Sequence, residues 1–219
     1  RSIEFSPERV EKIIEEKAFL NKGLKLIFKN EKDDVEKTFL YPEGVSSFLK
    51  SLLELGNTPP IGGESFALER ANGIKIEVAF CWTESTQEKV HSYVNGIHTK
   101  GGGTHEDGFK SGLSKAIRNY ISVHNLLPKG VKITGEDIRE GLTCVLSVFI
   151  GDPMFQGQTK DRLATAEAQR IVEQAMKDPF DHWLSGNPNQ ANRLLDFVID
   201  RAEERLRRRQ EKETARKTA

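Results

Sequence analysis

The run from Leu142 to Ile150 constrains the fold more than any other part of the chain. It is apolar at nearly every position, which is typical of a strand buried inside a sheet. The run is also far shorter than the roughly 20 apolar residues that a membrane-spanning helix needs. The sequence therefore predicts a globular domain with a sizeable core, built around this strand.

Alternating apolar residues upstream predict the neighbouring strands. From Ile74 to Trp82 every second residue is apolar, so one face of this strand is expected to be core. Asn72-Gly73, a strong hairpin signal, separates it from a second run at Phe66 to Arg70. The run from Lys89 to Ile97 predicts a third antiparallel strand.

Two start signals predict helices between these strands. Thr104 with Asp107, and Thr134 with Asp137, have the spacing of a capping pair. After Thr104 an apolar stripe follows at helical spacing: Phe109, Leu113, Ala116, Ile117, Tyr120 and Ile121. The order of strands, helix and strand predicts an α+β fold with an antiparallel or mixed sheet.

Helices dominate from Thr165 onward, with a break expected at Asn187-Pro188 and a long final helix beginning at Pro188. The stretch from Arg201 to Ala219 holds eight basic and four acidic residues, a net charge of +4. Few apolar residues follow Leu206. We expect the last part of this helix to be a solvated, basic extension.

The N-terminal residues predict an incomplete unit. Ser6-Pro7 is a good helix start, and the runs 24–28 and 37–41 are typical of a hairpin. One helix and one hairpin cannot bury their apolar faces, because an isolated hairpin is marginal in water. We therefore expect residues 1–43 to be the C-terminal edge of a domain that begins upstream, and residues 44–219 to form a second domain.

Composition excludes several classes of protein. The 33 basic and 33 acidic residues cancel, so any basic surface must be local. Cys81 and Cys144 each lie in an apolar run, which favours reduced core residues. Their spacing fits no zinc-binding motif. The N-terminus lacks the apolar segment of a signal peptide. We expect a cytoplasmic protein without membrane contact or bound metal.

The loop from Gly151 to Leu163 sets Lys160 behind Gln158 and Thr159 in a turn-rich stretch. This Gln-Thr-Lys sequence resembles the corresponding loop of the B subunit of bacterial DNA gyrase and of topoisomerase IV. Further segments resemble consecutive parts of that subunit in the same order: KAFLNKGL, FLYPEGVSSFLKSL, YVNGIHTKGGGTHEDGFKSGL and EDIREGLTCVLSVFIGDPMFQGQTKDRL. Together they cover most of residues 17–163, and the resemblance favours gyrase over topoisomerase IV.

The resemblance implies a fold and a domain layout. Residues 1–43 would be the end of an ATP-binding domain of the gyrase, chaperone, histidine kinase and MutL type. The remainder would be a transducer domain, similar to a domain of a ribosomal protein, with a left-handed strand-helix-strand crossover and long C-terminal helices. The nucleotide-binding motifs would precede Arg1.

The resemblance also assigns roles to the loop. Gln158 and Lys160 would contact the γ-phosphate of ATP, with Lys160 as the catalytic cation. A positioned cation is worth on the order of 3 kcal/mol in such a reaction. From composition alone, Lys160 is more simply a solvated side chain that opens a helix at Asp161. ATP and Mg²⁺ would belong to the intact enzyme, and the fragment alone would bind neither and be inactive.

The expected activity is that of an ATP-dependent type II DNA topoisomerase, an isomerase, in which this domain couples ATP hydrolysis to DNA strand passage. The implied partners are DNA, an A-type cleavage subunit and a second copy of the ATP-bound subunit. Two alternatives stay open: a MutL-type repair ATPase, and a non-enzymatic module that binds nucleic acid or acts as a scaffold.

Three other groups of residues have two interpretations each. Gly101 to Gly103 could bind a phosphate or make a tight strand-to-helix connection. The Gly-Lys-Ser/Thr pattern of a phosphate-binding loop is missing, which favours the connection. His91, His98 and His105 have spacings that fit packing better than a metal site. The basic tail could line a DNA cavity through Arg205, Arg208 and Arg209, or form intrahelical pairs such as Glu203–Arg207 and Glu204–Arg208.

Overall fold

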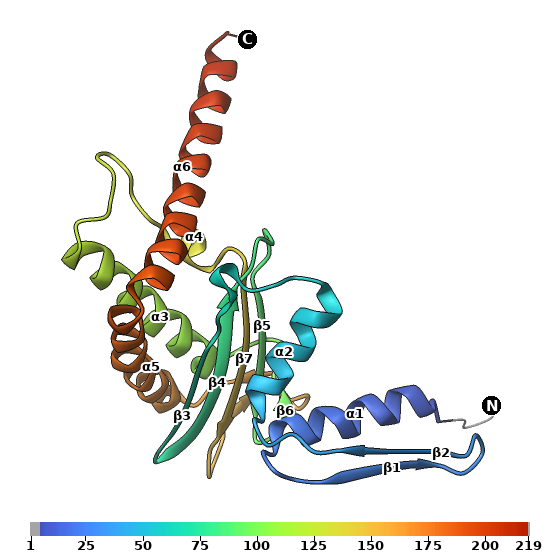
Figure 1. The fold of residues 1–219 in the computed structure, drawn as a ribbon. Coiled ribbons are helices and arrows are strands. Elements are labelled where there is room, and N and C mark those ends of the chain that lie inside the picture. Colours follow the sequence, from blue (N-terminus) through green and yellow to red (C-terminus); the bar gives the residue numbers. More distant parts are fainter. Residues whose placement is uncertain (1–4, 219) are drawn as a thin grey trace.

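A computed structural model describes residues 5–218 as a mixed sheet with helices on both faces (Figure 1). Helices α3 (Thr104–Val123) and α5 (Ala166–Gly186) cover one face, and α2 (Val45–Gly56) covers the other. The long α6 and the hairpin β1–β2 project from this body in different directions. Within the described residues, no helix is long and apolar enough to span a membrane.

The sheet has the strand order β3-β4-β7-β5-β6. Strands β3 (Phe66–Asn72) and β4 (Ile74–Trp82) form the expected hairpin, and β4 also pairs antiparallel with β7 (Leu142–Phe149). The strand predicted at Lys89 to Ile97 is present up to Val94, but it does not lie beside β4 as a third antiparallel strand. Strand β5 (Lys89–Val94) runs parallel to β7, and the chain then turns back into the short β6 (Ile97–His98).

The position of β7 explains this error. Its residues are buried from Leu142 to Val148, so it takes the centre of the sheet and separates β4 from β5. A parallel pair needs a crossover connection, and here α3 (Thr104–Val123) and the short α4 (Gly135–Arg139) lie between β5 and β7. The predicted strand-helix-strand crossover is confirmed, and its handedness stays a prediction.

The two helix start signals have different outcomes. Thr134 and Asp137 form a reciprocal capping box, with distances of 3.2 and 2.9 Å between side-chain oxygen and backbone nitrogen. Thr104 is not a cap, because Gly103 holds that position. The Thr104 hydroxyl instead donates to the Thr165 carbonyl at 2.7 Å, which ties α3 to the start of α5.

The second face of β4 is also buried, contrary to the expectation of one core face. Glu77, Ala79 and Cys81 are at most 3% exposed, like the apolar residues of the other face. Helix α2 (Val45–Gly56) covers this side together with the C-terminal end of α1 (Pro7–Leu20), where the rings of Phe19 and Phe48 stack at 4.8 Å. Both cysteines are buried and unpaired, as predicted.

The N-terminal segment contains α1 and the hairpin of β1 (Leu26–Asn30) and β2 (Val35–Phe39). Its small core is formed by Ala18, Phe28 and Phe39. A row of apolar side chains stays between 36 and 52% exposed: Ile13, Leu24, Ile27, Val35 and Leu40. The segment therefore leaves apolar surface uncovered, as its sequence predicts.

The C-terminal part consists of α5 (Ala166–Gly186) and α6 (Pro188–Thr218), with the predicted break at Asn187. Helix α5 packs closely on α3, since a Cβ at Gly108 would lie 2.3 Å from the Gln169 carbonyl oxygen. A short 3-10 turn, Ile61–Gly63, lies in the linker between α2 and β3 and contacts α6. Helix α6 extends well beyond the sheet (Figure 1).

Candidate functional site

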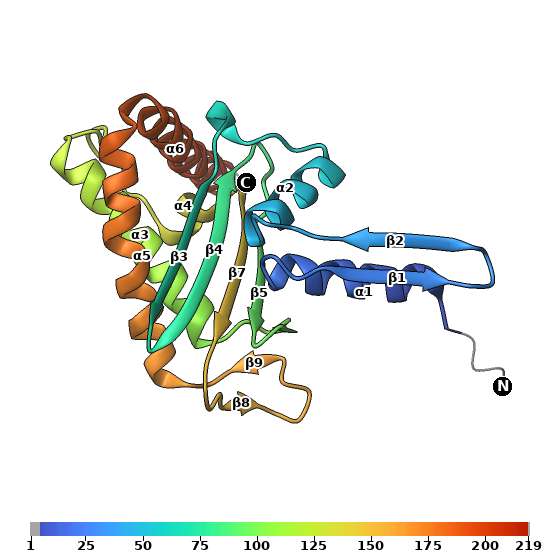
Figure 2. The ribbon, with the colours of Figure 1, turned by 60° about the horizontal axis from the view of Figure 1, so that its bottom comes forward.

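Lys160 lies in a small hairpin formed by β8 (Phe155–Gln156) and β9 (Arg162–Leu163). The hairpin leaves the end of the sheet next to β7 (Figure 2). Helix α5 begins only at Ala166, so a helix that opens at Asp161 is not formed. The interpretation of Lys160 as a helix-opening residue is therefore wrong, because β9 lies between Lys160 and α5.

The tip of this hairpin presents two polar side chains. Gln158 and Lys160 are both exposed, and Lys160 has the left-handed backbone angle φ of 57°. A non-glycine residue in this region is uncommon and costs of order 1 kcal/mol or more, which points to a local constraint. The Lys160 ammonium lies 5.9 Å from the ring centroid of Phe155.

Among residues 5–218, Lys160 has no acidic partner, which it shares with the nearby Lys100 but not with Arg162 or Lys110. Arg162 pairs with Asp107, and Lys110 pairs with Glu88 and Glu106. No carboxylate of the described residues lies within 4 Å of the Lys160 ammonium. This ammonium is thus available to an anionic ligand that approaches the tip.

The foot of the hairpin is bound to the glycine turn 101–103. The Gly101 amide donates to the Asp161 carbonyl at 2.8 Å, and the Leu163 amide donates to the Gly102 carbonyl at 3.1 Å. Gly103 and Leu163 form a parallel bridge. A Cβ on Gly103 would lie 2.5 Å from both the amide nitrogen and the carbonyl oxygen of Leu163, so the two backbones meet only because this residue is glycine.

These contacts favour the structural interpretation of the glycine stretch. The Gly101 and Gly102 amides already donate to the carbonyls of Asp161 and Thr99. An anion site would need such amides free and pointing outward. The glycine turn is therefore a connection that anchors the lysine hairpin.

Arg162 adds a side-chain contact that the sequence analysis missed. Its guanidinium donates to the Gly101 carbonyl at 2.8 Å and lies 3.5 Å from the Asp107 carboxylate. Asn95 holds the other end of the loop, with bonds of 2.8 and 2.9 Å to the backbone of Ile150. Both ends of the loop that carries Lys160 are thus fixed to the body of the domain.

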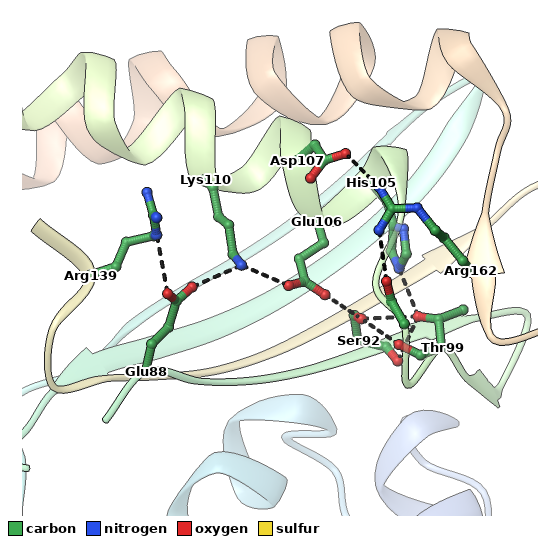
Figure 3. Close-up of polar contacts among 10 residues, drawn as sticks. Glu88, Ser92, Thr99, His105, Glu106, Asp107, Lys110, Arg139 and Arg162 are labelled. Carbon is green, nitrogen blue, oxygen red and sulfur yellow. Dashed lines mark hydrogen bonds and ion pairs between the residues drawn. The ribbon is translucent and has the colours of Figure 1, made fainter. Parts of the chain in front are cut away.

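Beneath the glycine turn lies a connected set of polar side chains (Figure 3). Glu106 accepts from the Ser92 hydroxyl at 2.9 Å and pairs with Lys110 at 2.9 Å. Glu88 lies between Lys110, at 2.9 Å, and Arg139, at 3.2 Å. Two acids and two bases therefore balance their charges between α3, α4 and the residue that precedes β5.

The histidines take packing roles, as predicted. His105 is fully buried and hydrogen-bonded to Thr99 at 3.1 Å, and burial lowers the pKa of its imidazole to about 4. It is therefore uncharged near neutral pH. The rings of His91 and His98 stack at 6.4 Å. No group of three or more His, Cys, Asp or Glu side chains that could hold a metal occurs in residues 5–218.

The basic tail is largely engaged in ion pairs. Arg205 donates to both carboxylate oxygens of Asp137 at 2.9 Å and to the Lys132 carbonyl at 2.9 Å. The expected Glu204–Arg208 pair is present, whereas Arg207 lies near Glu211. A further pair joins Arg209 to Glu213 at 3.1 Å. The side chains of Arg208 and Arg209 nevertheless stay 68 and 74% exposed, which leaves N–H groups that face solvent.

The Asp137–Arg205 contact supports a stability prediction. Asp137 is 2% exposed; burial raises the pKa of its carboxyl, but the bonds from Arg205 and Thr134 outweigh this and leave the pKa below its ordinary value. We expect Arg205→Ala to lower the free energy of unfolding by about 2 kcal/mol at pH 7, because a buried carboxylate loses its main partner. Urea denaturation measures the change.

The pH dependence of this effect provides a check. A lowered folded-state pKa stabilises the protein above the unfolded-state value of about 4, and this stabilisation is lost as the pH falls through the folded-state pKa. The cost of Arg205→Ala should therefore shrink below about pH 4. Arg209→Ala, which removes an exposed pair, should cost less than about 0.5 kcal/mol. An equal cost for both variants would contradict this account.

Solved structures similar to this chain define its class of fold. The 43K ATPase domain of Thermus thermophilus gyrase B, in complex with an aminocoumarin, matches with a TM-score of 0.87 and 31% identity. The match covers 97% of this chain and 57% of that chain. The ATP-binding domain of Francisella tularensis topoisomerase IV matches with a TM-score of 0.82 and 32% identity, over 94% of this chain and 55% of that chain. The fold is that of gyrase and topoisomerase ATPase regions.

Sequence comparison defines the family. The family model described as DNA gyrase B matches residues 10–214. The B subunit of DNA topoisomerase 4 from Bartonella bacilliformis is 42% identical over 98% of this chain and 32% of that protein. The B subunit of DNA gyrase from Helicobacter pylori is 37% identical over 98% of this chain and 28% of that protein. The chain belongs to the DNA gyrase B family, and it spans about a third of the length of these relatives.

Proposed function

We propose that this chain is the coupling part of an ATP-dependent type II DNA topoisomerase, an isomerase, in which Gln158 and Lys160 contact the γ-phosphate of ATP. The observation that carries the proposal is the Lys160 ammonium, which is exposed, has no acidic partner among residues 5–218 and stands on an anchored hairpin. Lysine suits the role as a compact positive charge, and the Gln158 amide can donate without adding charge.

The rest of the nucleotide site would come from an ATP-binding domain of which residues 1–43 are the last part. The uncovered apolar side chains of this segment support that assignment, because they need a covering layer. The lysine hairpin leaves the sheet on the side from which α1 and β1–β2 also project (Figure 2). A domain completed there would lie beside the hairpin, and residues 44–219 would form the transducer domain.

ATP and Mg²⁺ belong in this proposal to the intact enzyme. One exposed ammonium and one amide fit a single face of a triphosphate, and they supply neither a base pocket nor oxygen ligands for a metal. Bound ATP would supply the γ-phosphate that this hairpin holds. The chain alone is therefore proposed to bind neither and to have no ATPase activity.

Coupling would follow from the loss of one contact. While the γ-phosphate is present, Lys160 and Gln158 hold the transducer against the ATP-binding domain. Once phosphate leaves, the contact is lost and the two domains can move as rigid bodies. We propose that this movement drives DNA strand passage together with an A-type cleavage subunit and a second copy of the ATP-bound subunit, in the cytoplasm and without membrane contact.

ATP turnover by an extended chain, meaning this chain joined to the flanking parts that its relatives have, tests this function. The variant is Lys160→Ala, and the role requires a large loss of turnover with nucleotide binding retained. Turnover as fast as in the unaltered extended chain would reject the role. Of the alternatives, the family match does not favour a MutL-type protein or a scaffold.

We also propose that the end of α6 contacts DNA phosphates. The proposal rests on Arg208 and Arg209, whose side chains are mostly exposed. Arg205, the third candidate, already donates to Asp137 and has fewer free N–H groups. Such contacts would be salt-dependent and would not read the base sequence.

Salt titration of DNA binding tests this surface. Each phosphate contact contributes about 0.9 to the slope of log K against log salt concentration, so replacing Arg208 and Arg209 by alanine should lower the slope by about 2. The loss should be similar for unrelated DNA sequences. The control replaces Arg70 and Arg118, which are also exposed. An equal change of slope in the control would reject a specific role for the end of α6.

A further inference from the structure

We propose that Arg162 and Glu106 are positioning residues for Lys160. They hold the glycine turn and the foot of the lysine hairpin in one arrangement, so that the ammonium keeps a defined place. This inference rests on the proposed phosphate contact of Lys160, and it names the side chains on which that contact depends.

The hairpin cannot hold Lys160 by itself. Strands β8 and β9 have only two residues each, and the residues from Gln156 to Lys160 are exposed. An isolated two-stranded hairpin is marginal even when it is longer. The position of the tip must therefore depend on contacts between the foot and the body of the domain.

Arg162 makes the side-chain part of that contact. It follows Lys160 by two residues and donates to the Gly101 carbonyl at 2.8 Å, a neighbour that is 61 positions away in sequence. Its guanidinium also lies 3.5 Å from Asp107 on the first turn of α3. The Asp107 pair is about half exposed and is screened by solvent, so the bond to the carbonyl is the stronger constraint. Arg162 thereby joins the hairpin to the turn and to α3.

Glu106 supports the turn from below. A Cβ on Gly102 would lie 2.9 Å from the Glu106 Oε2, so this carboxylate touches the backbone of the turn. The same oxygen accepts from the buried Ser92 hydroxyl, and Oε1 pairs with Lys110. The Glu106 side chain is only 16% exposed, so these bonds are better shielded from water than the Asp107 pair.

The network of Glu106 also reaches the elements that contact α6. Lys110 pairs with Glu88, and Glu88 pairs with Arg139 on α4 (Figure 3). Helix α4 is held to α6 by the bonds between Asp137 and Arg205. The side chains that fix the turn are therefore linked to the C-terminal helix through α4, which carries both Arg139 and Asp137.

Amide hydrogen exchange in this chain tests the positioning role without ATP. In Arg162→Ala and in Glu106→Ala, the amides of Gly101 and Leu163 should exchange about tenfold faster, because their bonds join the turn to the foot. The amide of Val172 in the core of α5 should not change. Arg170→Ala, an exposed arginine on α5, is the matched control, and Arg162→Lys should restore part of the protection at Leu163.

Turnover by the extended chain supplies the second readout. If Arg162 positions Lys160, Arg162→Ala should lower kcat about tenfold with the KM for ATP unchanged, and Arg162→Lys should recover part of the loss. Unchanged exchange at Gly101 and Leu163, or full turnover by Arg162→Ala when Lys160→Ala is impaired, would overturn the inference. If exchange is faster in Arg162→Ala but turnover is full in both Arg162→Ala and Lys160→Ala, the proposed function of Lys160 is wrong instead.

Discussion

Replacing Lys160 by alanine is expected to slow ATP turnover by the extended chain about a hundredfold while leaving ATP affinity nearly unchanged. A fixed cation that faces the γ-phosphate stabilises the charge that grows on its oxygens during transfer, and the loss of one such donor typically costs a factor of about 10² to 10³. The ammonium has no carboxylate partner within 4 Å in the described residues, so its removal breaks no internal ion pair. Steady-state turnover and equilibrium nucleotide binding measure the two quantities separately.

The control for this prediction is Lys100→Ala. Lys100 is also exposed and directly precedes the glycine turn, so it tests whether any positive charge near the hairpin would serve. We expect less than about a twofold change in turnover for the control. If both variants lose activity equally, general electrostatics would explain the result better than a positioned contact.

The second large effect is expected from Gly103→Ala, which should lower the free energy of unfolding by about 3 kcal/mol. Gly103 has φ of 138° and ψ of −169°, a backbone region that is open almost only to glycine. The new methyl group would also lie 2.5 Å from two backbone atoms of Leu163. Urea denaturation measures the loss, and a lower midpoint with an unchanged slope would show lower stability without a change in the surface exposed on unfolding.

Gly151→Ala is the matched control for this substitution. Gly151 begins the loop that carries Lys160, and a Cβ there would meet no atom within 4 Å. This variant should have nearly the stability of the unaltered chain. If Gly103→Ala is as stable as Gly151→Ala, then the close approach of the turn to the hairpin is not required.

Sequence patterns predicted which elements form better than they predicted which elements lie side by side. The run from Leu142 to Ile150 and the alternation from Ile74 to Trp82 predicted two strands of the sheet, β7 and β4. The partner of β5 could not be predicted, because local periodicity does not say which strand lies alongside. The burial of Glu77 and Ala79 was missed for a similar reason, since α2 and α1 cover that face.

The site shows the same division. Lys160 and Gln158 could be proposed from the sequence because their short motif lies within one loop. Arg162 was missed because its partner is a backbone carbonyl at Gly101, and no sequence pattern records such a contact. Glu106 was missed because its neighbours Ser92 and Lys110 meet only when β5 and α3 pack together. The structural role of the glycine stretch was predicted correctly, but its contact with the lysine hairpin was not.

The most direct test of the central claim is a crystal structure of the extended chain with a non-hydrolysable ATP analogue bound. If Lys160 is the phosphate-contacting cation, its ammonium will have left the Phe155 ring and will lie about 2.8 Å from an oxygen of the γ-phosphate. A bound analogue whose γ-phosphate is held entirely by other residues, with Lys160 still facing solvent, would contradict the claim.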